Sequence, residues 1–148
     1  MRKSKGFTLI ELLIVMTVII ILAGILIPSF RGFQNDAWIV KAESEIGVVQ
    51  TAVESYYRNH RGTYPDSIQD LLKVNPKIIP SLPEDPFKTD KDTYGYKIVY
   101  KNPGKEAYYV IYSHGPNHEV DWTWDASKGV VILAPGSDDI LLTNAILE

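Results

Sequence analysis

The sequence contains no cysteine, so disulfide bonds and thiol catalysis are excluded and the redox compartment stays undecided. It also lacks a basic patch interleaved with aromatic residues. The formal net charge is −3, and without Arg2, Lys3 and Lys5 the rest would carry −6. This charge balance argues against a nucleic-acid-binding protein. Neither a Gly-x-Ser-x-Gly motif nor a phosphate-binding loop is present, so no catalytic site is expected.

A long apolar run near the N-terminus dominates what the sequence does contain. Its 21 residues, 7–27, would form a helix of about 31 Å, close to the bilayer hydrocarbon thickness of about 30 Å. Three basic residues precede the run and predict that the N-terminus stays in the cytoplasm. Everything beyond Pro28 would then lie across the membrane.

Glu11 lies inside this apolar run, where a carboxylate costs about 2.5–3.5 kcal/mol even on lenient insertion scales. A secretory signal peptide would have a shorter apolar core and a better cleavage site than Leu22-Ala23-Gly24. A plain signal anchor explains the length of the run but not the charge. Cleavage between Gly6 and Phe7 would explain it. The new α-amino group, with a pKa of about 7.7–8.0, would lie one helical turn from Glu11 and could pair with it.

Residues 5–12 read KGFTLIEL, and they carry a family resemblance. The stretch resembles the class III signal sequence of type IV pilins and type II secretion pseudopilins, with a short basic leader, Gly6 before the cut and Phe7 after it. The resemblance implies that a membrane aspartyl peptidase, the prepilin peptidase, removes residues 1–6 and methylates the amine of Phe7. Glu11 would neutralise the Phe7 amine of its own or a neighbouring subunit and so set the register of assembly.

Beyond the apolar run the pattern is that of an amphipathic helix. Six residues at intervals of three and four form one apolar stripe: Trp38, Ala42, Ile46, Val49, Val53 and Tyr56. Gly62 and Pro65 end the pattern, and His60 is expected to interact with the carbonyl end of the helix.

The sequence therefore predicts one helix over about residues 8–59. Residues 7–28 would be its transmembrane or filament-core half, and residues 29–62 its amphipathic half. We expect the helix to bend or loosen at Pro28, and also at Gly24 and Gly32.

Residues 63–148 are expected to form a globular head. A short helix would follow Pro65, with Asp66 or Ser67 as its N-cap. Strands are predicted over residues 94–101, 107–113 and 130–133, the first two joined by a turn at residues 102–106. One face of this small antiparallel sheet would cover the helix stripe. The fold class is α+β and pilin-like.

The head carries further motifs in the order TYPDSIQDLL, LPEDPF, YGYKIVY and YSHGPN. This order resembles the major pseudopilin of type II secretion. The resemblance implies a non-enzymatic structural subunit in the inner membrane, with its head in the periplasm. An ATP-driven assembly platform would stack it, with itself and with minor pseudopilins, into a pseudopilus. A type IV pilin or minor pilin of a surface fibre is the alternative. A membrane-anchored periplasmic enzyme or binding protein is the rival from another class.

A calcium site is one interpretation of the acidic pair Asp138 and Asp139, which resembles the calcium-binding aspartates of major pseudopilins. Ser113 and Asn117 match the segment that shapes the same loop, although the family usually has aspartate at the position of Asn117. The family also lacks the insert at residues 118–136. That insert leaves open whether the site is rebuilt, lost or replaced by a contact surface. The alternative is a solvated acidic turn.

Two other patterns are open to a functional interpretation. His114 and His118 lie four residues apart beside Glu119, but Gly115-Pro116 between them disfavours the helix that four-apart zinc ligation needs. A surface histidine pair is therefore expected. The tryptophans of the insert, Trp122 and Trp124, alternate in a strand-like segment and would be either an interface or part of the core.

Overall fold

A computed structural model describes residues 6–88, 90, 92–101 and 106–148. The basic residues of the leader and most of the turn predicted at residues 102–106 lie outside this range. The chain divides into two compact units, residues 1–37 and residues 38–148, and each is described by itself.

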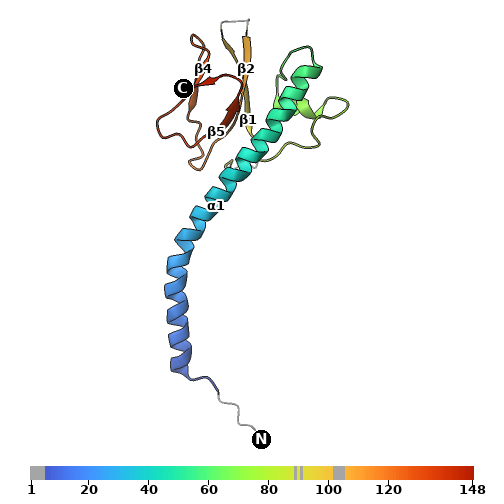
Figure 1. The fold of residues 1–148 in the computed structure, drawn as a ribbon. Helices are drawn as coiled ribbons and strands as arrows, with labels where there is room; N and C mark the ends of the chain where they lie inside the picture. The colour runs from blue at the N-terminus through green and yellow to red at the C-terminus, as the bar shows by residue number, and fades with distance from the viewer. Residues whose placement is uncertain (1–5, 89, 91, 102–105) are drawn as a thin grey trace. The chain divides into compact units, whose positions relative to one another are not determined.

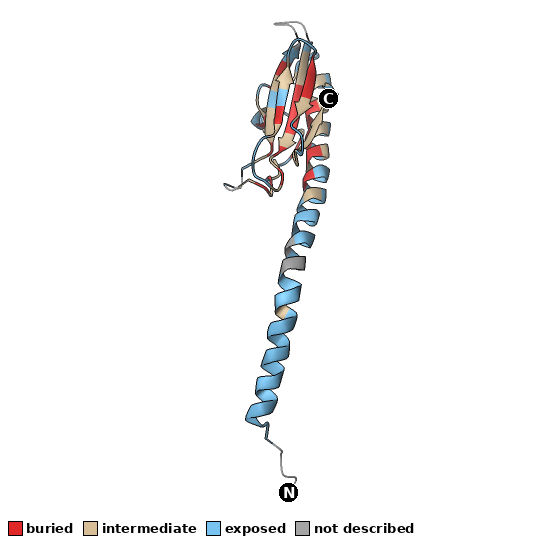
Figure 2. Cartoon of the chain, turned by 90° about the vertical axis from the view of Figure 1, so that its left-hand side faces the viewer, coloured by how far each residue is buried: buried red, intermediate tan, exposed pale blue. Residues whose placement is uncertain are grey.

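A single helix, α1 (Leu9–Asn59), contains residues of both units (Figure 1). Its bounds confirm the predicted range of about 8–59. The helix passes through Gly24, Pro28 and Gly32, so the loosening expected there does not interrupt it. Within the first unit its side chains are exposed wherever they are described, apart from the half-buried Ala23 (Figure 2). By length and composition this stretch could cross a membrane.

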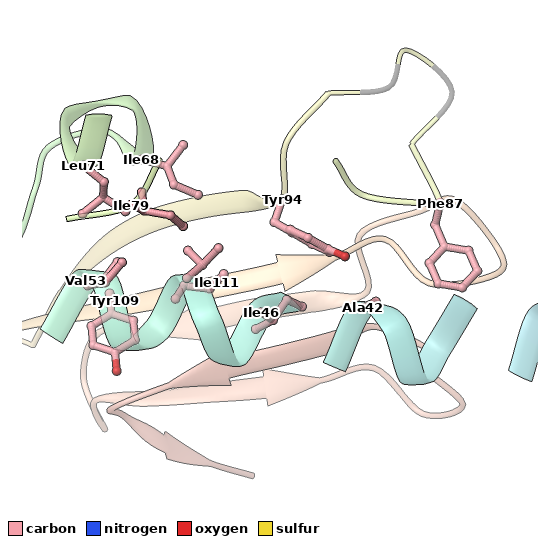
Figure 3. Close-up of a cluster of buried hydrophobic side chains, with 12 residues drawn as sticks. Ala42, Ile46, Val53, Ile68, Leu71, Ile79, Phe87, Tyr94, Tyr109 and Ile111 are labelled. Carbon is pink, nitrogen blue, oxygen red and sulfur yellow. The ribbon is translucent and has the colours of Figure 1, made fainter. Parts of the chain in front are cut away.

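In the second unit, α1 buries one stripe of apolar residues. Four of the six predicted stripe positions are fully buried: Ala42, Ile46, Val49 and Val53. They pack against Ile68, Leu71 and Ile79 from the chain after the helix, and against Tyr109 and Ile111 from a strand (Figure 3). Trp38 keeps 42% of its surface exposed and contacts the ring of Phe87 edge-on. The stripe therefore anchors the core, as its spacing predicts.

Six strands occur in the described part of the chain: β1 (Gly95–Lys101), β2 (Glu106–Ser113), β3 (Trp122–Asp125), β4 (Val130–Leu133), β5 (Ile140–Thr143) and β6 (Ile146–Leu147). They form two sheets, ordered β1-β2-β5 and β3-β4-β6. The neighbours are antiparallel except β4 and β6, which are parallel. The three predicted strands and the α+β, pilin-like fold class are confirmed; the strands belong to two small sheets and not to one.

The second sheet exists because the insert, residues 118–136, supplies strands β3 and β4. Alternate residues of β2 face opposite sides of the first sheet: Ile111 packs in the core with α1, and Val110 packs with Trp122 and Val131 between the sheets. The indole of Trp124 is half-buried and its Nε1 donates to the carbonyl of Tyr100 at 3.2 Å. The insert tryptophans are therefore part of the core between the sheets.

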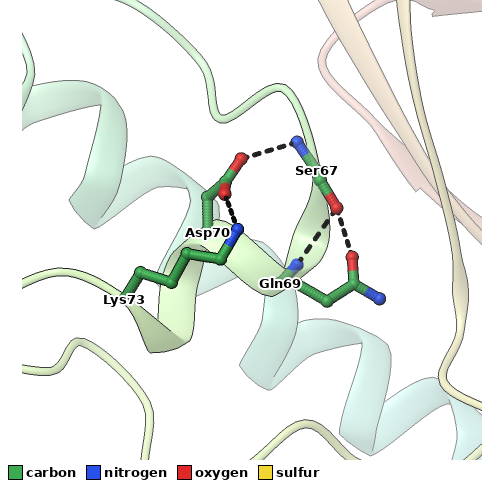
Figure 4. Close-up of polar contacts among 4 residues, drawn as sticks. All are labelled: Ser67, Gln69, Asp70 and Lys73. Carbon is green, nitrogen blue, oxygen red and sulfur yellow. Dashed lines mark hydrogen bonds and ion pairs between the residues drawn. The ribbon is translucent and has the colours of Figure 1, made fainter.

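The short helix of the head is the 3₁₀-helix η1 (Ile68–Leu72), and Ser67 is its N-cap (Figure 4). Its Oγ accepts from the backbone N–H of Gln69 at 3.4 Å. The carboxylate of Asp70 accepts the backbone N–H of Ser67 at 3.0 Å and pairs with Lys73 at 2.8 Å. These contacts satisfy N–H groups that the first turn leaves without helical partners. Of the two predicted caps, Ser67 is the correct one.

Replacing Ile46 by alanine is expected to lower the free energy of unfolding by about 2–4 kcal/mol, because it leaves a cavity in a fully buried position. Val48→Ala is the matched control. Val48 lies two residues away on the same helix with 54% of its surface exposed, so the change should stay within about 0.5 kcal/mol. Tryptophan fluorescence of the detergent-solubilised chain during denaturation measures both, since all tryptophans lie in the second unit. Equal losses from the two variants would contradict the assignment of the core.

Candidate functional site

The N-terminus of α1 is closed by a contact between Thr8 and Glu11. One oxygen, Oε2 of Glu11, accepts both the backbone N–H of Thr8 at 2.9 Å and the Thr8 hydroxyl at 2.7 Å. In return, the backbone N–H of Glu11 donates to Oγ1 of Thr8 at 3.3 Å. This reciprocal pair is a capping box, with Thr8 as N-cap and Glu11 three residues on. The Thr-x-x-Glu spacing is the sequence signal of this capping box.

The residues on either side of the expected cleavage point are accessible. Gly6 and Phe7 precede the helix without regular secondary structure, and Phe7 has 84% of its surface exposed. The α-amino group of Phe7 arises only after cleavage. In the uncleaved chain, the Glu11 carboxylate is therefore held by its own Thr8.

A second group of polar residues gathers where the loop after β2 meets the loop before β5. The backbone N–H of Asn117 donates to Oδ2 of Asp138 at 2.9 Å, and its side-chain amide donates to Asp121 at 2.6 Å. The backbone N–H of Asp121 donates to Oδ2 of Asp139 at 2.6 Å. Thus Asn117, Asp138 and Asp139, predicted from distant parts of the sequence, meet in one loop cluster with Asp121 of the insert.

Gly115 permits the close approach of these two loops. It has a φ of +64°, and a Cβ at this position would lie 2.3 Å from the backbone oxygen of Asp138. A side chain there would separate Asn117 from Asp138, so the glycine of the YSHGPN segment is a structural requirement of the cluster.

The carboxylates of this cluster are incompletely satisfied. Oδ1 of Asp138 and Oδ1 of Asp139 are buried and have no hydrogen-bond partner in the described part of the chain. Burial raises the pKa of Asp139. The hydrogen bond from the Asp121 backbone opposes this rise in pKa, and the Asp121 carboxylate adds to it. A cation could satisfy oxygens that lack donors, because calcium prefers carboxylate and carbonyl ligands.

The other predicted ligand, Ser113, is occupied elsewhere. It is fully buried, and its Oγ donates to Oδ1 of Asp85 at 2.7 Å. The same Oδ1 accepts the backbone N–H of Phe87 at 3.0 Å, while Oδ2 accepts that of His114 at 3.4 Å. Asp85, only 2% exposed, thus ties the LPEDPF loop to the end of β2. This role is absent from the sequence-based predictions, and the aspartate of LPEDPF is its only signal in the sequence.

The three histidines have structural contacts. Nδ1 of His118 hydrogen-bonds the carbonyl of Phe87, and the ring of His114 stacks on Tyr112 at 5.8 Å between centroids. Within the described residues, no group of three histidine, cysteine, aspartate or glutamate side chains is arranged to hold a metal ion. Nδ1 of His60 lies 2.9 Å from the carbonyl of Tyr56, which confirms the predicted contact at the end of α1.

Comparison with known families covers most of the chain. Residues 1–27 match the family described as "Prokaryotic N-terminal methylation motif". Residues 30–127 match the family described as "Type II secretion system (T2SS), protein G". The chain belongs to the protein G family. It is therefore a structural subunit of the pseudopilus of type II secretion, as the sequence motifs predict, and the members of this family are structural proteins and not enzymes.

Individual relatives agree with this assignment to protein G. Type II secretion system core protein G of Escherichia coli (strain K12) is 32% identical over 126 residues, covering 80% of this chain and 86% of that protein. Its counterpart in Vibrio cholerae is 28% identical over 123 residues, covering 78% and 82%. A fimbrial protein of Pseudomonas aeruginosa is 46% identical, but over only 55 residues, 37% of this chain and 36% of that protein. The pilin alternative thus has weaker support. No solved structure matches the chain.

Proposed function

We propose that this protein G subunit is made as a precursor, cleaved between Gly6 and Phe7 by a prepilin peptidase and methylated on the Phe7 amine. The processed subunit spans the inner membrane through residues 7–28, with its head in the periplasm. An ATP-driven inner-membrane platform then stacks it, with further copies and minor pseudopilins, into a periplasmic pseudopilus. The observation that carries this proposal is the match of residues 1–27 to the N-terminal methylation motif.

Within this scheme Glu11 has two successive partners. Before assembly, Thr8 holds its carboxylate in the capping box. In the filament, the carboxylate pairs with the Phe7 amine of a neighbouring subunit, which removes an unpaired charge from an apolar environment. The pairing would set the register at which each subunit is added.

Mass spectrometry of the purified protein tests the processing step. We expect a chain that begins at Phe7 and carries an added methyl group on its N-terminus. A Gly6→Leu variant, which obstructs the cleavage position, should retain Met1. An intact Met1 in the unaltered chain from cells containing the peptidase would contradict the proposal.

We also propose a calcium ion at the loop cluster, bound by Asp138, Asp139 and the side chain of Asn117. The buried Oδ1 atoms of Asp138 and Asp139 support this proposal, because each lacks a donor. Ser113 contributes to the cluster only by holding the end of β2 through Asp85. Calcium would link the two loops and stabilise the head.

Removing calcium with a chelator is expected to lower the melting temperature of the head. At a free concentration of about 100 times Kd, a bound ion stabilises by about 2.7 kcal/mol. The double variant Asp138→Asn, Asp139→Asn should melt at the same temperature with and without chelator. A melting temperature of the unaltered chain that does not respond to chelation or added calcium would count against the ion.

A further inference from the structure

A groove lies between the last turns of α1 and the loop that follows η1. Two adjoining cavities, of about 360 and 710 Å³, share Ser55 and Ile78 and form it together. The first is largely apolar and is lined by Val48, Ile78 and Ile79, whereas the second is more polar. Arg58 lines the first cavity and Lys77 the second.

Both cavities of the groove contain a positively charged residue, Arg58 in the first and Lys77 in the second. None of its described lining residues is acidic, and neither Arg58 nor Lys77 has an ion pair in the described part of the chain. This contrasts with the net charge of −3 of the whole sequence. A ligand that suits the groove therefore carries an apolar group beside a carboxylate.

The last strand of the head presents those two groups. Ile146 and Leu147 of β6 have 66% and 50% of their surfaces exposed. The parallel pairing with β4 continues through Glu148, whose N–H donates to Val131 at 2.9 Å. Alternate residues of a strand share a face, so Ile146 and Glu148 lie on the same side, about 6.6 Å apart along the strand. The ion pair of Glu148 with Lys128 joins two exposed side chains and is therefore weak, so the Glu148 carboxylate can exchange it for another cation.

The spacing of these groups suits the groove. Side chains in a helix point back toward its N-terminus, so the guanidinium of Arg58 lies over the turn before its own Cα. Thr51 lines the same cavity and lies seven residues before Arg58, about 10.5 Å along the helix; the backward tilt of Arg58 by one turn leaves about 5 Å, comparable to the separation of Ile146 from Glu148. Ile146 can therefore contact Thr51 while Glu148 meets Arg58.

We propose that β6 of one subunit docks into this groove of a second copy of the chain. The groove belongs to the layer of α1, and β6 belongs to the sheet on the far side of β1-β2-β5, so one subunit presents the two surfaces on opposite sides (Figure 1). A contact between unlike surfaces is heterologous, and it generates an open filament when the rotation from one copy to the next does not close a ring. The proposal rests on the proposed function and specifies one contact between the heads; the apolar helices contribute the rest of the interface.

Cysteine cross-linking in assembled filaments tests the contact, and the sequence has no native cysteine to interfere. The full chain carrying Thr51→Cys and Ile146→Cys is expected to give a ladder of disulfide-linked oligomers on oxidation, because Thr51 is exposed and lines the groove. The matched control pairs Ile146→Cys with Val40→Cys, which is on the same helix and 64% exposed but does not line the groove. The control should give severalfold less product. Equal yields from the two pairs, or no ladder from the first, would overturn the proposal.

A charge exchange provides an independent measurement. Arg58→Glu should reduce the amount of filament, and adding Glu148→Arg in the same chain should restore it. Loss without restoration would contradict the pairing of these two residues. Failure of the proposed function would look different from failure of the docking alone. In the first case the unaltered chain would form no filaments and would keep Met1, which would also overturn the docking. In the second case the unaltered chain would form filaments, but the variants would not behave as expected.

Discussion

Replacing Glu11 by alanine is expected to abolish pseudopilus assembly while cleavage after Gly6 continues. In the variant, the Phe7 amine of each subunit lies in an apolar environment and has no carboxylate to pair with. A charge in that position costs about 2.5–3.5 kcal/mol, which corresponds to association weakened by more than about 50-fold. Sheared filaments are measured by immunoblot, and processing by mass spectrometry of the same cells.

Thr8→Val separates the two roles of Glu11. It removes the hydroxyl of the capping box but keeps the carboxylate, so the helix end loses about 1 kcal/mol and assembly should fall only severalfold. If Thr8→Val and Glu11→Ala were equally defective, the capping box and not the amine would explain the need for Glu11. Normal filaments from Glu11→Ala would refute the pairing altogether.

Replacing Asp85 by alanine is expected to lower the free energy of unfolding by about 3–5 kcal/mol. The carboxylate is 2% exposed and accepts from Ser113, Phe87 and His114, so its loss leaves buried donors without acceptors. The melting temperature of the detergent-solubilised chain should fall by about 10 °C or more.

Ser113→Ala is the control for this experiment. It removes one donor but leaves the Asp85 carboxylate with its two backbone N–H groups, so the loss should be about 1 kcal/mol. A small effect of Asp85→Ala, equal to that of Ser113→Ala, would show that the carboxylate is not required to hold the loop on β2.

The long helix and its buried stripe could be predicted because their signals are local. Ala42, Ile46, Val49 and Val53 recur at helical spacing, and Ser67 is a short-range N-cap signal. Strands β1 and β2 were likewise predicted, because each is a run of aromatic and β-branched residues. In all these cases the neighbouring residues along the chain determine the structure.

The second sheet could not be predicted as a whole, because two of its strands are very short and β6 pairs with β4 from a distant part of the chain. β3 has only four residues and lies in the insert, and β6 has two. Neither length is distinctive without a partner strand. Asp85 was missed for the same reason: its main partner, Ser113, lies 28 residues away and nothing local marks the carboxylate as buried. The Thr8–Glu11 capping box is different, because its Thr-x-x-Glu spacing is a local signal in the sequence.

The position of β2 between β1 and β5 has a consequence for biogenesis. β1 and β2 are adjacent in sequence and can pair as soon as both have emerged, but β5 follows β2 only after the whole insert. Contacts of long sequence separation form late. With the proposed topology, the helix enters the membrane first, and the head cannot close its core until residue 143 has been translocated. Each subunit is thus anchored before it is folded, and a protease in the periplasm would encounter an open head only during that interval.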